Sequence, residues 1–170
     1  LGLLGFCYSK VTVKSHVCGL RCIKITEVSI LYNIARFLMF IVLRVVALGN
    51  EKIKTFLKGR KGLIPRIRQE VDADVPKAWF HCASLGEFEQ GRPLIEEAKK
   101  QFSEYKIILT FFSPSGYEIR KNYEGADVIC YLPMDTKSNA KAFIDMVKPE
   151  KVFFVKYEFW YHFITELKTR

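Results

Sequence analysis

The sequence predicts an α/β protein whose parallel sheet follows an apolar helix, and three observations support this prediction. Hydrophobic residues make up 49% of the 170 residues, which is enough for a packed core. From Trp79 onward, short apolar runs alternate with stretches of helical periodicity, which is typical of parallel strands joined by right-handed crossovers. Ahead of this alternation, residues 29–48 form an apolar run of roughly the 20 residues that span a bilayer core.

The apolar run at residues 29–48 is interrupted by a polar stripe. Asn33, Arg36 and Arg44 share one narrow face of a helix because of their spacing. One interpretation is a membrane-spanning helix whose arginines extend to the interface. A second is a helix that lies in the interface with this stripe towards lipid phosphates, and a third is an amphipathic helix packed on a soluble core.

Positive charge is concentrated in the front part of the chain. The net charge of +9 divides into +10 for residues 1–70, with 13 Lys and Arg against 3 acids, and −1 for residues 71–170, with 14 against 15. A nucleic-acid-binding domain would carry its basic patch on the folded part, so nucleic acid is not an expected partner. Basic residues directly after an apolar helix instead favour an anionic membrane surface, with residues 50 onward in the cytoplasm.

Four strands and four helices are expected in the alternating part of the chain. The strands are predicted at residues 78–82, 106–112, 127–131 and 152–155. The helices are predicted at residues 88–102, 115–123 and 139–147, and from about residue 159. Together they predict a doubly wound, Rossmann-like parallel sheet. We therefore expect four segments: an N-terminal extension at 1–27 without an assigned function, a membrane-anchor helix at 28–49, a basic linker or helix at 50–76, and the α/β domain at 77–170.

Ligands of such a sheet bind outside the carboxyl ends of its strands, so the first loop is informative. Gly86 allows close approach of a ligand to the backbone, and Glu87 lies in the first turn of the following helix. A carboxylate at this position can act as a general base on a hydroxyl group. The alternative is a capping box, in which Ser84 caps the helix and Glu87 follows three residues later.

Two further loops carry candidate binding residues at the same edge of the sheet. Ser113, Ser115 and Gly116 could present hydroxyl and N–H groups to a phosphate, or could simply begin a helix. Glu158 beside Trp160 suits sugar recognition through a carboxylate and an apolar ring face. The alternative for this pair is a helix start with a buried tryptophan.

Metal, cofactor and nucleotide sites are not predicted. The five cysteines are odd in number, and the CxxxC pair of Cys18 and Cys22 has no second pair at zinc-ligand distance, so reduced thiols are expected. The sequence contains neither GxGxxG nor a Walker-type GxxxxGK[ST] motif.

Four ordered sequence blocks resemble the bacterial 3-deoxy-D-manno-octulosonate (Kdo) transferases of glycosyltransferase family 30. The blocks are WFHCASLGE with PLI at residues 79–95, LTFFSPSG at 109–116, YLPMD at 131–135 and YEFW at 157–160. The N-terminal apolar helix and the KGR stretch at residues 58–60 also fit, so the resemblance covers residues 28–170. One departure is Lys156, where many relatives carry an acidic residue.

The resemblance implies the N-terminal, acceptor-binding half of a two-domain GT-B glycosyltransferase. CMP-Kdo would bind mainly to a C-terminal domain beyond Arg170, so the domain at 77–170 is expected to be incomplete and inactive alone. Glu87 would be the general base that activates a glucosamine hydroxyl of a lipid A precursor, lipid IVA, without a metal or cofactor. The substrate-binding residues would be Ser84, Gly86, Ser113, Ser115, Gly116, Glu158 and Arg60.

The implied location is the cytoplasmic face of the bacterial inner membrane, in lipopolysaccharide core biosynthesis. Basic residues between 52 and 68 would attract the anionic lipid acceptor. Two alternatives use the same features. One is a non-catalytic, membrane-tethered α/β module that binds anionic lipid, and the other is a GT-B transferase that uses a different sugar donor.

Overall fold

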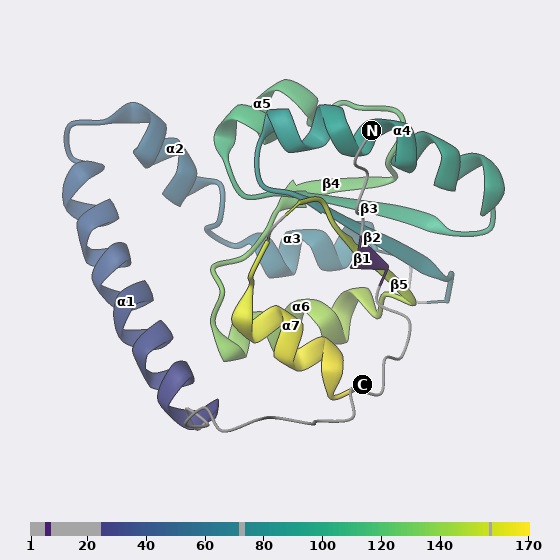
Figure 1. Cartoon of the computed structure of the whole chain (residues 1–170). Helices are drawn as coiled ribbons and strands as arrows, with labels where there is room; N and C mark the ends of the chain where they lie inside the picture. The colour runs from purple at the N-terminus through teal and green to yellow at the C-terminus, as the bar shows by residue number, and fades with distance from the viewer. Residues whose placement is uncertain (1–5, 8–24, 72–73, 157) are drawn as a thin grey trace.

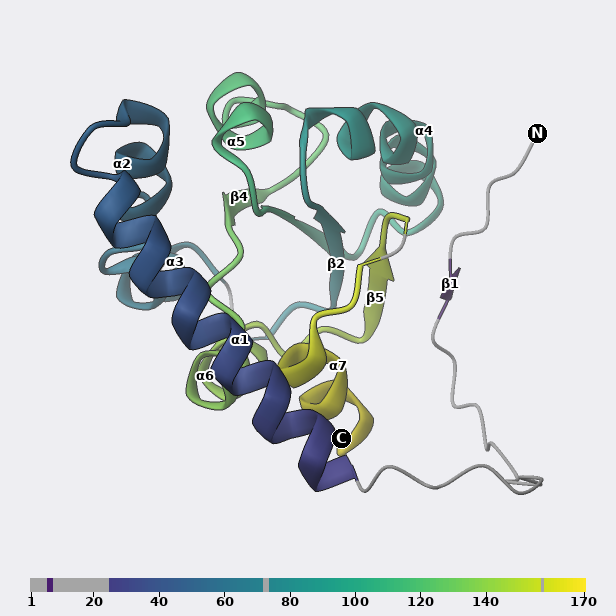
Figure 2. The ribbon, with the colours of Figure 1, turned by 60° about the vertical axis from the view of Figure 1, so that its left-hand side comes forward.

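The computed structural model describes residues 6–7, 25–71, 74–156 and 158–170. In this part of the chain a sheet lies between two layers of helices, and one long helix, α1, stands at the side (Figures 1 and 2). The described strands are β1 (Phe6–Cys7), β2 (Lys77–Cys82), β3 (Lys106–Phe111), β4 (Val128–Tyr131) and β5 (Lys151–Phe154). The described helices are α1 (Ile25–Val46), α2 (Glu51–Lys58), α3 (Leu63–Glu70), α4 (Leu85–Gln101), α5 (Pro114–Arg120), α6 (Lys137–Val147) and α7 (Tyr161–Lys168).

The strand order within the described sheet is β1-β5-β2-β3-β4. Strands β5, β2, β3 and β4 run parallel, whereas β1 pairs antiparallel with β5. The predicted Rossmann-like parallel sheet is therefore confirmed, with strand limits within one or two residues of those expected. Strand β1 was not predicted; the rest of the proposed extension at residues 1–27 lies largely outside the described residues.

The chain reverses its direction of travel across the sheet between β2 and β5. It proceeds outward from β2 to β3 and β4, then crosses back to place β5 on the other side of β2. The crossovers on either side of this point leave in opposite directions, and in doubly wound sheets this arrangement places the ligand crevice above the carboxyl ends of the two strands. This topological switch point is where a doubly wound sheet places its ligand.

Strand β2 is buried along its whole length because helices cover both faces of the sheet. Trp79 points into one core cluster with Phe143 of α6 and Phe163 of α7. Its neighbour Phe80 points into the other cluster with Phe88 of α4. Successive side chains of a strand alternate between faces, so a continuous apolar run such as AWFHC is what a central parallel strand requires.

Helix α1 contacts the domain through a small polar seam. The Tyr32 hydroxyl donates to the Asp135 carboxylate at 2.5 Å, and Asn33 Oδ1 lies 3.0 Å from His162 Nε2. Asp135 also accepts the backbone N–H groups of His162 and Phe163, and so anchors the start of α7. Because Asp135 follows β4 and α7 follows β5, α1 lies on the side where the parallel strands end (Figure 1).

The predicted polar stripe of α1 is divided between two environments. Asn33 faces α7 through His162, and the half-buried Arg36 lies beside it, with Nη2 3.5 Å from Asn33 Oδ1. Arg44 is exposed and rests over the ring of Phe40. The division arises because only the N-terminal half of α1 meets α7, a tertiary contact that helical spacing does not reveal.

Prediction on stability. Phe143→Ala should lower the free energy of unfolding of the domain by about 3–5 kcal/mol, because its fully buried ring fills the space between Trp79 and Phe163. Chemical denaturation followed by tryptophan fluorescence measures this change. Ile119→Ala, at a site 58% exposed on α5, is the control and should stay within about 0.5 kcal/mol. Equal effects of the two changes would contradict the described core.

Candidate functional site

Two loops meet at the switch point between β2 and β5 and carry the acidic residues that the sequence singled out. The loop after β2 leads through Ser84 into α4, and the loop after β5 leads through Glu158 into α7. The loop after β3 joins the first of these, since the N–H groups of Phe112 and Ser113 both donate to the carbonyl oxygen of Ala83. The three predicted loops are thereby brought to one edge of the sheet.

Glu87 lies in the first turn of α4 and is bound by Ser84. The Ser84 hydroxyl donates a hydrogen bond to the Glu87 carboxylate, and Ser84 forms no side-chain cap with the backbone of α4. The alternative of an ordinary capping box is therefore wrong in its first half, because that motif requires the serine oxygen to accept a backbone N–H. The serine instead orients the carboxylate. One carboxylate oxygen is occupied, and the group keeps acceptor capacity for a substrate hydroxyl.

Gly86 leaves the approach to Glu87 open. Gly86 is exposed, and a Cβ built there would have only Ser84 Oγ, at 3.8 Å, within 4 Å. The position is therefore not required for close internal packing. It leaves room for a ligand beside the Glu87 carboxylate; the substrate-binding role of Gly86 stays a prediction.

Glu158 lies at the same edge with its side chain 17% exposed. Burial raises the pKa of the Glu158 carboxyl, the Trp160 indole N–H lowers it, and the negative charge of Glu87 raises it again. Burial, together with the negative charges of Glu87 and Glu158, raises the pKa of the Cys82 thiol to about 12. The two acids therefore influence the same groups across the crevice, and Cys82 stays a neutral thiol at physiological pH rather than a nucleophile.

The loop after β3 is built as a helix start. Ser113 Oγ accepts the N–H of Ser115, and the two hydroxyl oxygens lie 2.9 Å apart. Gly116 is buried, and a Cβ there would lie 2.3 Å from Phe111 Cδ1 and 3.2 Å from the backbone N of Leu85. Gly116 therefore lets α5 pack closely against β3 and the start of α4, which supports the alternative of an ordinary helix start. The Ser115 side chain remains exposed.

Arg60 is placed beneath the edge of the sheet, with its guanidinium group directed at the backbone. It donates to the carbonyl oxygens of Leu132 at 2.9 Å, Phe56 at 2.9 Å and Phe112 at 2.6 Å. It also lies over the rings of Phe56, Phe112 and Tyr131. Burial lowers its pKa to about 10, which leaves the group charged at neutral pH. The contacts make Arg60 the clamp that fastens α2 to the ends of β3 and β4.

A buried polar chain beneath the site was not assigned by sequence reasoning. Trp79 Nε1 donates to Thr110 Oγ1 at 2.8 Å, and His81 Nδ1 lies 2.9 Å from the same oxygen. His81 Nε2 in turn lies 3.9 Å from Glu158 Oε2. The pairing of β2 with β3 and β5 creates this chain, and no local motif in the sequence signals it.

Within the described residues, no three or more His, Cys, Asp or Glu side chains gather as a metal site requires. The carboxylates of Glu87 and Glu158 both lie at this edge of the sheet, each near N–H or O–H groups. Such a pair can accept protons from hydroxyl groups and can hold sugar hydroxyls by hydrogen bonds.

Comparison with known proteins assigns the chain to a family. Residues 56–170 match the family model described as 3-deoxy-D-manno-octulosonic-acid transferase (kdotransferase). The chain belongs to the Kdo transferase family. The match begins within α2 and includes both loops of the crevice, which confirms the resemblance found in the sequence blocks.

Curated proteins of the same name match this chain over only part of their own length. The Aquifex aeolicus (strain VF5) Kdo transferase is 36% identical over 83 residues, which are 48% of this chain and 23% of that protein. The Chlamydia trachomatis serovar D protein is 35% identical over 101 residues, 58% and 23% of the two chains. The Haemophilus influenzae protein is 31% identical over 93 residues, 54% and 22%. The chain thus spans less than a quarter of the length of these relatives.

Prediction on Arg60. Arg60→Lys should destabilise the fold by about 1.5–3 kcal/mol, because a lysine cannot keep the fork of bonds to three carbonyl groups. Denaturation of the two proteins measures the difference. The matched control is Arg92→Lys on the exposed surface of α4, with an expected change within about 0.5 kcal/mol. Unchanged stability combined with weaker acceptor binding would instead assign Arg60 to the substrate.

Proposed function

We propose that this chain is the acceptor-binding part of an enzyme that transfers Kdo from CMP-Kdo to a lipid A precursor, lipid IVA. The observation that carries the proposal is the Glu87 carboxylate at the switch point of the sheet, oriented by Ser84 and close enough to Glu158 to affect its pKa. Membership of the Kdo transferase family supports the donor and the reaction class. The donor site would lie in the C-terminal domain of the complete GT-B enzyme.

In the proposed reaction, Glu87 removes the proton from a glucosamine hydroxyl of the acceptor. The freed oxygen forms a bond to the anomeric carbon of Kdo, and the bond from that carbon to the phosphate oxygen of CMP breaks. CMP leaves with the electron pair, and Glu87 holds the proton. The hydrogen bond from Ser84 fixes the carboxylate rotamer, so that the base is already oriented when the hydroxyl arrives.

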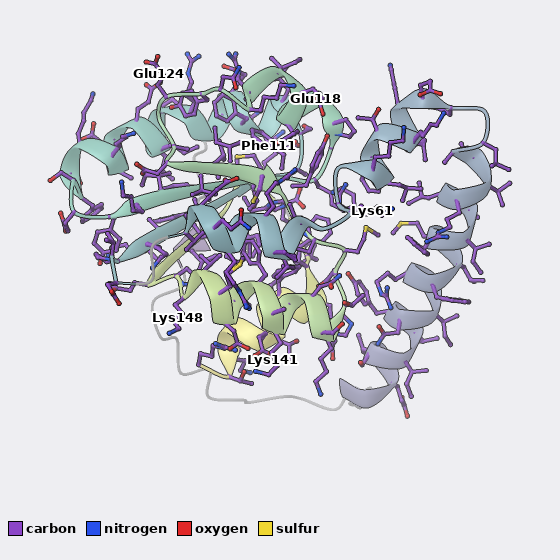
Figure 3. All side chains as sticks on the ribbon, turned by 180° about the vertical axis from the view of Figure 1, so that it is seen from behind. Lys61, Phe111, Glu118, Glu124, Lys141 and Lys148 are labelled. Carbon is purple, nitrogen blue, oxygen red and sulfur yellow. The ribbon has the colours of Figure 1, made fainter. Side chains whose placement is uncertain are left out.

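The proposed site of action is the cytoplasmic face of the bacterial inner membrane. Helix α1 contains the one candidate span among the described residues, Glu27–Val46, with a mean hydropathy of 1.8 and none of its best window buried. Lys52, Lys58 and Lys61 are exposed next to it, and Figure 3 shows Lys61 in the connection between α2 and α3. An apolar helix with a basic flank would hold the domain at an anionic lipid surface.

The contacts of α1 favour a helix that lies in the interface over one that spans the bilayer. Tyr32 and Asn33, near its N-terminal end, bond to Asp135 and His162 of the domain. A spanning α1 would carry these polar groups and the start of α7 into the hydrocarbon region, where burial of a carboxylate is costly. The residues from 34 to 46 alone, at 1.5 Å per residue, span only about 20 Å of the roughly 30 Å core.

Prediction on the base. In the full-length protein, Glu87→Gln should reduce Kdo transfer to the lipid A precursor by more than about 100-fold, because the amide cannot accept the hydroxyl proton. Glu89→Gln is the matched control on the same helix; Glu89 pairs with Arg92 and Arg120 outside the crevice, and its change should leave the rate within about twofold.

Two outcomes of this assay would contradict the proposal, one for the role of Glu87 and one for the reaction. Equal transfer by wild type and Glu87→Gln would retain the reaction and reduce Glu87 to a structural residue. No transfer by a folded wild-type enzyme would favour a different sugar donor, or a lipid-binding module whose binding depends on the lysines at 52, 54 and 58 and not on Glu87.

Prediction on the membrane. Alkaline carbonate should release the protein from membranes that contain anionic lipid, because a helix in the interface lacks the full span that resists extraction. Removal of anionic lipid from vesicles should weaken binding strongly, and binding to vesicles that contain anionic lipid should weaken as the salt concentration rises. Retention in the membrane after carbonate treatment would contradict an interfacial helix and support a spanning one.

A further inference from the structure

The imidazole of His81 presents an unsatisfied nitrogen inside the site. The residue is fully buried on β2, and its Nδ1 lies 2.9 Å from Thr110 Oγ1. Its Nε2 has no hydrogen-bond partner among the described residues. A buried polar atom without a partner is costly, so a fully buried ring with one free nitrogen calls for a functional explanation.

The hydrogen bonds around Thr110 determine which ring nitrogen of His81 carries the hydrogen. The indole of Trp79 can only donate, so it occupies one lone pair of Thr110 Oγ1. The single hydroxyl hydrogen of Thr110 can then go to His81 Nδ1 at 2.9 Å or to the carbonyl oxygen of Phe80 at 3.3 Å. In the arrangement proposed below, the hydroxyl hydrogen goes to Nδ1, the shorter of the two contacts, and the hydrogen of the neutral ring is then on Nε2.

The ring remains neutral at physiological pH. Burial lowers the pKa of His81 to about 3, the positive charge of Arg60 contributes in the same direction, and the contact with Thr110 offsets only part of this effect. A neutral imidazole has one N–H, so the side chain offers a single directed donor and adds no positive charge to the crevice.

The free nitrogen of His81 faces the Glu158 carboxylate. Nε2 lies 3.9 Å from Glu158 Oε2, and the rings of Trp160 and Phe154 lie edge-on to the imidazole at centroid distances of 5.3 and 6.0 Å. These rings enclose the imidazole with apolar surface and leave the carboxylate as its polar neighbour. Hydrogen bonds of this kind are often long in the free enzyme and shorten when substrate binds.

We propose that His81 is a positioning residue: the chain of donors from Trp79 through Thr110 to His81 ends in an N–H that holds the Glu158 carboxylate toward the acceptor, opposite Glu87. The inference rests on the proposed function, since it gives Glu158 a task in acceptor binding. It also explains how two carboxylates coexist at one edge. Ser84 donates to Glu87, and in the proposed arrangement His81 would donate to Glu158, so that each negative charge would have its own hydrogen-bond donor.

The test compares two substitutions in the full-length enzyme. His81→Met removes both nitrogens in a similar volume, whereas His81→Gln retains a side-chain amide N–H that can reach the position of Nε2. The groups that face Glu158 are Glu87 from α4, Cys82 and His81 from β2, and Trp160 at the start of α7. Without the His81 donor, the Glu158 carboxyl should bind its proton more readily.

Three results are expected if the proposal is correct. His81→Met lowers kcat/KM for Kdo transfer about 10-fold, the scale of one hydrogen bond to a charged group. It also moves the acidic limb of the kcat/KM pH profile upward by about one pH unit, because loss of a donor to the ionised form raises a carboxyl pKa. His81→Gln restores most of the rate and the original limb.

A double-mutant cycle separates positioning from general damage to the fold. In a Glu158→Gln background, His81→Met should cost less than about twofold, since the two residues act as one unit. An undiminished loss in that background, or an unmoved pH limb in the single mutant, would overturn the proposal while Kdo transfer by wild type still stood. Absence of transfer by wild type would instead count against the proposed function.

A direct readout does not require activity. One-bond ¹⁵N–¹H coupling in histidine-labelled, full-length protein identifies the ring nitrogen that carries the hydrogen. The hydrogen is expected on Nε2 of His81. A hydrogen on Nδ1 would contradict the proposal, because Nε2 would then be a bare acceptor facing a carboxylate.

Discussion

The lateral pairing of β2 with β5 is the constraint on which the site depends. The two strands run side by side although about 70 residues separate them in the chain, and their register places His81 opposite Phe154. This pairing brings the loop that carries Glu87 next to the loop that carries Glu158. The pairing requires β2 to be a central strand that is buried on both faces. This explains why the sequence block WFHCASLGE begins with fully buried residues.

The electrostatic design of the crevice follows from that proximity. Burial raises the pKa of the Glu158 carboxyl, and the negative charge of Glu87 raises it further. The Ser84 hydroxyl donates a hydrogen bond to Glu87, and the imidazole N–H of His81 is the proposed donor to Glu158. Arg60 does not provide the compensating charge directly, because its guanidinium is directed at backbone carbonyls and aromatic rings.

The same clamp connects the site to the apolar helix α1. Arg60 fastens α2 to the ends of β3 and β4, and α2 follows directly after α1. A second attachment, from Tyr32 to Asp135, joins α1 to the start of α7, next to the loop that carries Glu158. Two attachments on different elements fix the direction of the apolar helix relative to the crevice. For an enzyme of the Kdo transferase family, this would set the height at which a lipid acceptor meets the base.

The sequence by itself determined the alternation of strands and helices, the apolar helix, the basic flank and the family, because hydrophobic periodicity and contiguous motifs are local properties of the chain. It also selected Glu87 and Glu158, since both follow predicted strands of the parallel sheet. Only the tertiary structure decided that Ser84 orients Glu87 rather than capping α4, that Gly116 serves packing and that Arg60 binds carbonyl groups. The chain from Trp79 through Thr110 to His81, and the docking of α1 on α7, likewise join residues from distant segments. Such contacts arise from strand order and helix packing, which a local pattern in one sequence does not encode.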